Sequence, residues 1–457
     1  MKKLTIILLI ICLLAGGVFL LYKIGFITFR RAEFSGNLYP PKNSNFYLYY
    51  DLSDIPLENF IKDEKLTTFL SYTEKNGSIF FVEDKENSFV ASINAKRGKG
   101  DEILMFLTDE IKKSGGVVEE KKISSFTVYE VLPSSENLTP YSPVSQPFYV
   151  SNLKDTVIFT TSLDTFKSVI YTKKKDSLLN TESFKKVIDK VPLDSNIFGY
   201  FNVNSQNIGE GGFYTEFHKD ALFVKGFYNK INPTTPIPLS ETILRFVGKD
   251  PFFIFGVRGL GNFLSQAVSS LQEQNPLIAG FTQGFDILGF LSLFKEDVIV
   301  SLNMKEEKPD FVVVSSLKGV DGVSKKIENF KNYLSQNFNF SFIRIPFEDA
   351  ELILGKSSSG VNIAISILSN FLFLGSEEGV KNSIISGKIG ESKTLNELLK
   401  GLGSDIQGDI TTVLFLDFSK LKNLGKDKVQ NLSSIYFVTL EEKKDANFIL
   451  KVELKKE

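Results

Sequence analysis

The side chains that most often carry catalysis or bind metals are scarce in this chain. Its 457 residues include one His, one Cys and no Trp. His218 is the only imidazole, so Ser-His-Asp catalysis, Cys-His catalysis and zinc binding would all depend on it. The only thiol is Cys12, and no G-x-S-x-G motif is present. We therefore predict no catalytic residues, no cofactor and no metal site, and we interpret His218 as part of a hairpin turn.

Two glycine-rich stretches are similar to nucleotide-binding loops but have the wrong spacing. GKSSSG at 355–360 lacks the glycine that a Walker loop requires five positions earlier, where Ala350 stands. GVRGLGN at 256–262 is spaced G-x-x-G-x-G, whereas the dinucleotide-binding turn requires G-x-G-x-x-G. We interpret the first stretch as a turn and predict no nucleotide site at either.

Carboxylates are the one abundant class of reactive group. The chain has 54 acidic and 53 basic residues and a formal net charge of −1. The acids mostly alternate with lysines, as in EEKK at 119–122 and KEEK at 305–308, which is typical of a solvated surface. Two kinds of chemistry that need carboxylates alone stay open: calcium binding, although no D-x-D-x-D-G run occurs, and glycosidase chemistry. The mixed charge offers no basic stripe for phosphates, so we predict no nucleic-acid partner.

The N-terminus has the pattern of a membrane anchor. Lys2 and Lys3 precede an uncharged run at 4–22, which as a helix would be about 28 Å long, close to the thickness of a hydrocarbon core. We predict a single-pass anchor over residues 1–30 that contacts the membrane through residues 4–22. A signal peptide cleaved near 15–17 is the alternative. Basic residues on the two sides nearly balance, so the lysine-rich start decides, and it favours a chain mostly outside the cytoplasm.

The remaining sequence contains one hydrophobic pattern twice. DTVIFTTSLDTFKSVI at 155–170 and NFLFLGSEEGVKNSI at 370–384 each predict a strand followed by a helix, with Ser162 and Ser376 at the helix N-caps. Acidic residues occupy the first turn of both helices and would repel an anion, so we interpret these turns as structural, not as phosphate sites.

Hairpins and amphipathic helices recur in step with this pattern. We therefore predict an α+β fold, in which an N-terminal transmembrane helix and a spacer at 31–44 precede two duplicated units. The units are predicted at 45–233 and 234–457, each a mainly antiparallel sheet with helices packed on one face.

A family resemblance follows from these features. The aromatic strand that ends in Asp-Leu-Ser at 51–53, the repeated strand-turn-helix and the N-terminal hydrophobic run resemble the bacterial family of membrane-anchored proteins labelled domain of unknown function 3352. The resemblance covers nearly all of the chain after the anchor. That family has no assigned activity, so the resemblance implies no catalytic residues.

Two stretches without a counterpart in the other half are candidates for partner contact. The loop at 133–148 is rich in Pro and Ser. The stretch at 260–294 carries few charges and is apolar almost all round after residue 278, which fits either a core helix or a contact surface. The predicted contact residues are Phe281, Phe285, Leu288 and Tyr141.

The favoured function is therefore binding without catalysis. We predict a single-pass protein of the bacterial cell membrane, exposed outside the cytoplasm, that binds a lipid, peptide or protein partner of the envelope. The alternative is a carboxylate-dependent hydrolase that acts on envelope glycans. The scarcity of His and Cys and the failed glycine motifs favour binding.

Overall fold

The structure is a computed structural model. It describes residues 38–53, 64–83, 88–132, 147–192, 195–205, 208–218, 220–233, 235–248, 251–274, 285–305, 308–389, 402, 409–421 and 432–454. The anchor predicted at 1–30 and much of the spacer predicted at 31–44 lie outside these residues. Within the described ranges, no helix is both long enough and apolar enough to cross a membrane.

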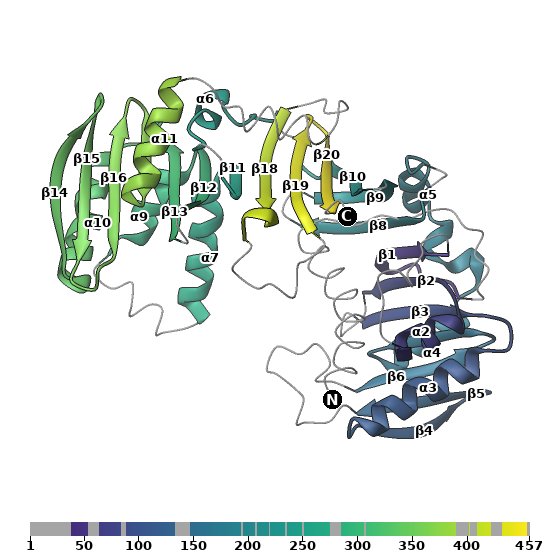
Figure 1. The fold of residues 1–457 in the computed structure, drawn as a ribbon. Coiled ribbons are helices and arrows are strands. Elements are labelled where there is room, and N and C mark those ends of the chain that lie inside the picture. Colours follow the sequence, from purple (N-terminus) through teal and green to yellow (C-terminus); the bar gives the residue numbers. More distant parts are fainter. Residues whose placement is uncertain are drawn as a thin grey trace. The chain divides into compact units, whose positions relative to one another are not determined.

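The chain divides between Pro233 and Thr234 into two compact units, except that His218–Leu222 groups with the second. The elements of the first unit (Figure 1) are β1 (Ser44–Asp51), α2 (Glu64–Ser71), β2 (Thr73–Val82), β3 (Ser88–Ala95), α3 (Gly100–Lys113), β4 (Val117–Ile123), β5 (Phe126–Leu132), β6 (Phe148–Leu153), β7 (Thr156–Thr160), α4 (Leu163–Tyr171), η3 (Lys174–Asp176), η4 (Leu178–Asn180), α5 (Glu182–Ile188), β8 (Ile197–Ser205), β9 (Ile208–His218) and β10 (Ala221–Lys230).

The second unit contains a similar series. Its elements are α6 (Glu241–Leu244), β11 (Phe253–Arg258), α7 (Leu260–Gln274), α9 (Ile287–Leu291), η5 (Ser292–Phe294), β12 (Asp297–Lys305), β13 (Lys308–Ser316), α10 (Val323–Phe338), β14 (Phe340–Phe347), β15 (Ala350–Ser357), β16 (Asn362–Leu368), β17 (Phe371–Gly375), α11 (Glu377–Ile389), β18 (Asp409–Asp417), η6 (Phe418–Leu421), β19 (Leu432–Glu441) and β20 (Asp445–Leu454).

Both units pair their strands in the same order. The first has the order β4-β5-β6-β7-β3-β2-β1-β8-β9-β10. The second has β14-β15-β16-β17-β13-β12-β11-β18-β19-β20. Every pair with a defined register is antiparallel. The strand-turn-helix segments β7–α4 and β17–α11 therefore occupy the same place in the two orders.

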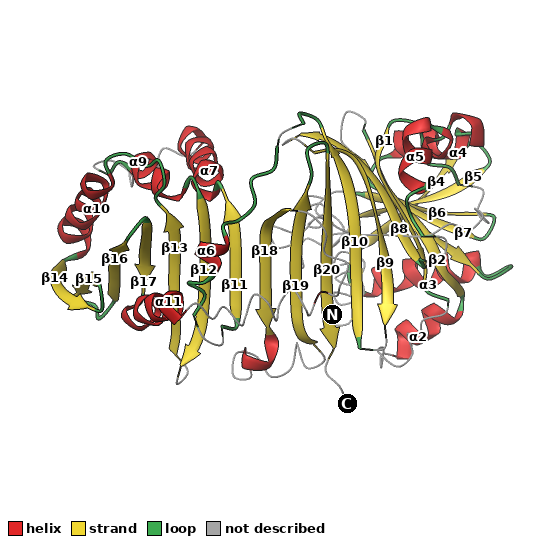
Figure 2. Ribbon diagram, turned by 90° about the horizontal axis from the view of Figure 1, so that it is seen from above, coloured by secondary structure: helices red, strands yellow, loops and turns green. Residues whose placement is uncertain are grey.

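The predicted fold, in which each unit packs its helices on one face of its sheet, is wrong. Helices cover both faces of the strands in each unit (Figure 2): α7, α9 and α10 lie opposite α6 and α11, and α4 and α5 lie opposite α2 and α3. The predicted transmembrane helix lies outside the described residues and stays a prediction.

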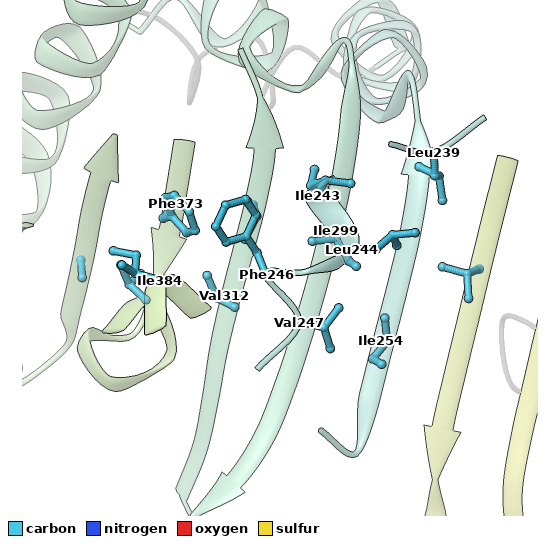
Figure 3. Packing of buried hydrophobic residues seen from close by; sticks show 14 of the residues in the cluster. Leu239, Ile243, Leu244, Phe246, Val247, Ile254, Ile299, Val312, Phe373 and Ile384 are labelled. Atoms are coloured by element: carbon cyan, nitrogen blue, oxygen red, sulfur yellow. The ribbon is translucent and has the colours of Figure 1, made fainter. Parts of the chain in front are cut away.

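The strand sequences of the second unit give the physical reason for cover on both faces. Successive residues of one strand point to opposite faces, and here both sets are apolar. Ile299 and Phe373 enter the core beneath α6 and α11, shown in Figure 3, whereas their neighbours Val298 and Leu372 enter the core beneath α9 and α10. A strand buried on both faces has a nearly continuous apolar sequence rather than an alternating one.

Candidate functional site

Five aromatic rings of the second unit pack together between α9 and α10. We call Phe285, Phe290, Phe294, Phe330 and Tyr333 the aromatic cluster. Phe290 stacks on Phe330 with 4.4 Å between ring centroids, and Phe285 stacks on Tyr333 at 4.7 Å. Phe294 meets Phe290 edge to face at 5.6 Å. Aromatic pairs of this kind contribute about 0.5–1.5 kcal/mol each beyond the area they bury.

A tight helix cap places the first of these rings. The Asp286 side chain accepts a hydrogen bond from the Gly289 N–H at 2.8 Å and so caps α9. A Cβ at position 289 would lie 1.9 Å from Asp286 Oδ2, so glycine is the residue that this cap accommodates. The cap fixes the turn between Phe285 and Phe290, whose rings contact each other at 5.6 Å.

The glycines of GVRGLGN bring α7 close to this segment. Gly259 has a φ of +75°, a left-handed conformation that side chains disfavour, and it precedes α7 directly. A Cβ at Gly261 would lie 2.1 Å from the Leu291 carbonyl oxygen, so the backbones of α7 and α9 approach too closely for any larger residue. Gly259 therefore forms the turn before α7, and Gly261 allows the close contact between α7 and α9.

Helix α10 supplies the other two rings from adjacent turns of one face. Phe330 and Tyr333 are separated by three residues, the spacing that puts side chains side by side on a helix. Charged groups of the same helix form ion pairs on the side that faces β14. Lys331 pairs with Glu328 at 2.8 Å, and Arg344 of β14 reaches Glu328 at 3.4 Å.

Apolar side chains remain exposed at the edge of the cluster. Leu288 of α9 is 43% exposed and Phe338, at the end of α10, is 54% exposed. Phe338 contacts Tyr333 edge to face at 5.9 Å. Aromatic rings with exposed apolar neighbours are a composition typical of protein interfaces, where aromatic residues are enriched.

The predicted contact residues have different positions in the structure. Phe285 is half-buried and stacked within the aromatic cluster, and Leu288 is exposed at its edge. Phe281 and Tyr141 lie outside the described residues. Tyr333 and Phe338 also belong to this surface but were not among the predicted contact residues. The three-residue spacing from Phe330 to Tyr333 is a signal in the sequence that could have indicated Tyr333.

Among the described residues, the carboxyl groups with shifted pKa values are all held in their charged form. A hydrogen bond from Lys65 lowers the pKa of Glu110 despite its burial, with Lys113 acting in the same direction. Lys121, and then Tyr149, lower the pKa of Glu130.

At Glu453, burial favours a raised pKa, but hydrogen bonds from Lys451 and Ser434 outweigh it and the pKa is lowered. A glycosidase general acid requires the opposite shift. Among the described residues, no group of three or more His, Cys, Asp or Glu side chains could hold a metal ion.

Two other interpretations from the sequence are confirmed. His218 is the last residue of β9, and the chain returns as β10 from Ala221. GKSSSG forms the end of β15 and the turn into β16, with Gly360 at a φ of +83°. Gly355 lies beneath the Phe342 ring, where a Cβ would come within 2.5 Å of a ring carbon.

Comparison with known proteins gives few matches. No family model matches the chain, and no curated protein matches it significantly in sequence. Part of the chain is similar in structure to TP0453 in its crystal forms I and III, with a TM-score of 0.26 in both cases. The sequences are 11% and 12% identical, and the matches cover 43% of this chain and 79% and 82% of TP0453. At this TM-score the similarity carries no argument about function.

Proposed function

We propose that this chain is a membrane-anchored bacterial envelope protein, exposed outside the cytoplasm, that binds a protein or peptide partner without catalysis. The partner contacts the aromatic cluster and its exposed neighbours Leu288 and Phe338. The observation that supports this is the combination of stacked rings with the exposed apolar side chains of Leu288 and Phe338 on the second unit.

A protein partner fits this surface better than a lipid acyl chain. Ligand sites for small apolar molecules are concave and enclose most of the ligand. Here the rings of Phe285, Phe290, Phe330 and Tyr333 contact one another and fill the space between α9 and α10. The exposed apolar side chains therefore lie outside this packing, where a protein partner can cover them.

The anchor and its orientation rest on the uncharged run at 4–22 and the lysines before it. Protease added to spheroplasts should remove the folded units while the membrane stays intact. Protection of both units until the cells are lysed would overturn the proposed orientation. Release of the whole chain by alkaline carbonate would overturn the proposed anchor.

Site-specific photo-crosslinking tests the binding surface. A photoreactive residue at Leu288 or Phe338 should crosslink one discrete protein in the membrane of living cells. The same residue at Val361, which is 53% exposed in the turn between β15 and β16, is the matched control and should not. With that protein purified, Leu288→Ser should weaken binding about tenfold or more, whereas Val361→Ser should leave it unchanged.

The outcomes separate the alternatives. Equal crosslinking at Leu288 and Val361 would remove this surface from consideration. Crosslinks to lipid alone would replace the protein partner by a lipid. Turnover of envelope glycans that is lost when a carboxylate is replaced would establish the hydrolase instead.

A further inference from the structure

A second exposed surface lies on the first unit, around the turn that follows α4. Lys173, Lys174 and Lys175 are consecutive and exposed. Lys185 also reaches this turn, since its Nζ donates a hydrogen bond to Asn180 Oδ1 at 2.7 Å, and Lys42 is exposed beside Pro41. We call these five lysines the lysine edge.

The opposing charges at the lysine edge are few. Asp176 is exposed within the turn itself. Glu182 lies next along the chain, 3.9 Å from Lys186. Lys42 and the three consecutive lysines form no ion pair with any residue in the described part of the chain. Their charges are therefore available to an anionic partner.

The lysine edge is also where the N-terminal chain joins the first unit. The Leu178 N–H donates a hydrogen bond to the Pro40 carbonyl oxygen at 2.9 Å, and Pro41 forms a β-bridge with Ser177. The chain that leads from the hydrophobic run at 4–22 therefore meets the folded unit beside Lys173–Lys175.

The length of that connection limits how far the lysine edge can lie from a membrane. Residues 23–37 can span at most about 50 Å, the length of a fully extended chain. Tethering over such a distance gives a high effective concentration of the edge at the surface. Tyr171, which is 62% exposed at the end of α4, adds a side chain of the type that favours the membrane interface.

We infer that the lysine edge docks the first unit on an anionic phospholipid surface. This inference rests on the membrane anchor of the proposed function, and it adds a second contact with the same membrane. Each lysine near an anionic surface contributes about a factor of five to binding, so three of them together are worth on the order of 100-fold. Salt weakens such contacts, because charges are screened over about 8 Å at physiological ionic strength.

A fluorescent label at position 171 tests the inference in the full chain. In a Cys12→Ser background, Tyr171→Cys provides a single labelling site, and Met105→Cys is the control. Met105 is 57% exposed on α3, which lies on the opposite face of the sheet from α4 (Figure 2). Each labelled chain is reconstituted into vesicles of phosphatidylcholine with or without phosphatidylglycerol, with a lipid-borne quencher.

The label at 171 should be quenched only when phosphatidylglycerol is present, and 0.5 M salt should reverse the quenching; the label at 105 should stay unquenched. The triple change Lys173→Glu, Lys174→Glu and Lys175→Glu should reduce the ratio of docked to undocked chain by more than about 100-fold, because it removes three positive charges and adds three negative ones. The matched control reverses Lys96, Lys112 and Lys122, which are exposed lysines of the same unit, and should leave the quenching unchanged.

Equal quenching at 171 and 105, quenching that ignores phosphatidylglycerol, or no quenching at all would overturn the inference. Should the lysine variant lose its fold, the corresponding glutamine variant and the salt reversal decide whether the lysines bind the vesicles. Failure of the anchor is detected separately, because alkaline carbonate would then release the chain from the vesicles. In that case salt-reversible quenching at 171, measured with vesicles added to the chain, still decides whether the edge binds anionic lipid.

Discussion

Replacement of Ser376 by Ala should destabilise the protein more than replacement of Ser162 by Ala. Ser162 Oγ caps α4 by accepting one hydrogen bond, from the Thr165 N–H at 3.3 Å. Ser376 Oγ accepts two, from the Gly379 N–H at 3.1 Å and from the Phe311 N–H at 3.2 Å, and it donates one to Asp310 Oδ1 at 3.1 Å. The serine of the second unit therefore caps α11 and also holds the end of this helix against β13.

The expected magnitudes follow from these contacts. Loss of an N-cap hydroxyl reduces the free energy of unfolding by about 0.5–2 kcal/mol, typically about 1 kcal/mol. Loss of the second accepted hydrogen bond at Ser376 and of the one donated to Asp310 adds about 0.5–1.5 kcal/mol each. We therefore expect about 1 kcal/mol for Ser162→Ala and about 3 kcal/mol for Ser376→Ala.

A second substitution distinguishes the two sites qualitatively. Aspartate caps helices as well as serine does, so Ser162→Asp should retain the stability of the wild type. Ser376→Asp should not, because Ser376 Oγ lies 3.1 Å from Asp310 Oδ1 and two carboxylates at this distance repel each other.

Hydrogen exchange of α4 and α11 is the appropriate measurement, because a chain with two units need not unfold in a single step. The protection of each helix reports the free energy of its own opening. A larger loss for Ser162→Ala than for Ser376→Ala, or equal rescue by Asp at both positions, would refute the reasoning.

Four further substitutions test the packing and the electrostatics. Lys65 lowers the pKa of Glu110 below its ordinary value of 4.5, so ionised Glu110 stabilises the fold above about pH 4.5. This contribution is lost as the pH falls. Glu110→Gln should therefore make the stability less dependent on pH in acid unfolding followed by circular dichroism. Gly261→Ala should lower the free energy of unfolding by about 1–3 kcal/mol in urea titrations, since its Cβ would meet the Leu291 oxygen. In the same assay, Phe330→Ala should lower the free energy of unfolding by about 2–3 kcal/mol, whereas Leu288→Ser should change it by less than about 0.5 kcal/mol. Similar values for the two substitutions would contradict the division of this surface into packed rings and exposed side chains.

Local features of the fold could be predicted from the sequence. The caps at Ser162 and Ser376 are confirmed, because an N-cap depends on a residue type and on the few residues after it. The hairpins β9–β10 and β19–β20 follow from short polar turns between apolar runs. Such signals lie within one stretch of sequence and need no knowledge of distant partners.

The arrangement of the strands could not be predicted in this way. Strand β3 pairs with β7, and Val90 lies opposite Thr160 although α3, β4, β5 and β6 lie between these two strands in the chain. No local pattern encodes such a pairing. Cover on both faces was predictable in principle, since the runs at 298–300 and 311–314 are apolar without alternation, the pattern typical of strands buried on both sides.

The candidate site was predicted only in part. The low charge of 260–294 predicted Phe285 and Leu288 as contact residues. It could not show that the Phe285 ring is packed in the cluster whereas the Leu288 side chain is exposed. That distinction depends on α10, a helix whose Phe330 and Tyr333 receive the rings of the earlier segment. The orientation of a side chain in an apolar segment depends on its partner element.

Comparison of the two units gives the strongest argument for the location of the partner site. Between β1 and β2 the described chain contains only α2, whereas between β11 and β12 it contains α7, α9 and η5. The strand order is the same in both units, so the additional helices are not needed to complete the sheet. They also change the role of the next helix. Helix α3 buries aliphatic residues such as Ile103 and Leu107, but α10 buries only Ile327 fully and directs Phe330 and Tyr333 toward the added segment. The sheet does not require the segment from α7 to η5, yet α10 packs aromatic rings against it. A function other than completing the fold best explains this segment.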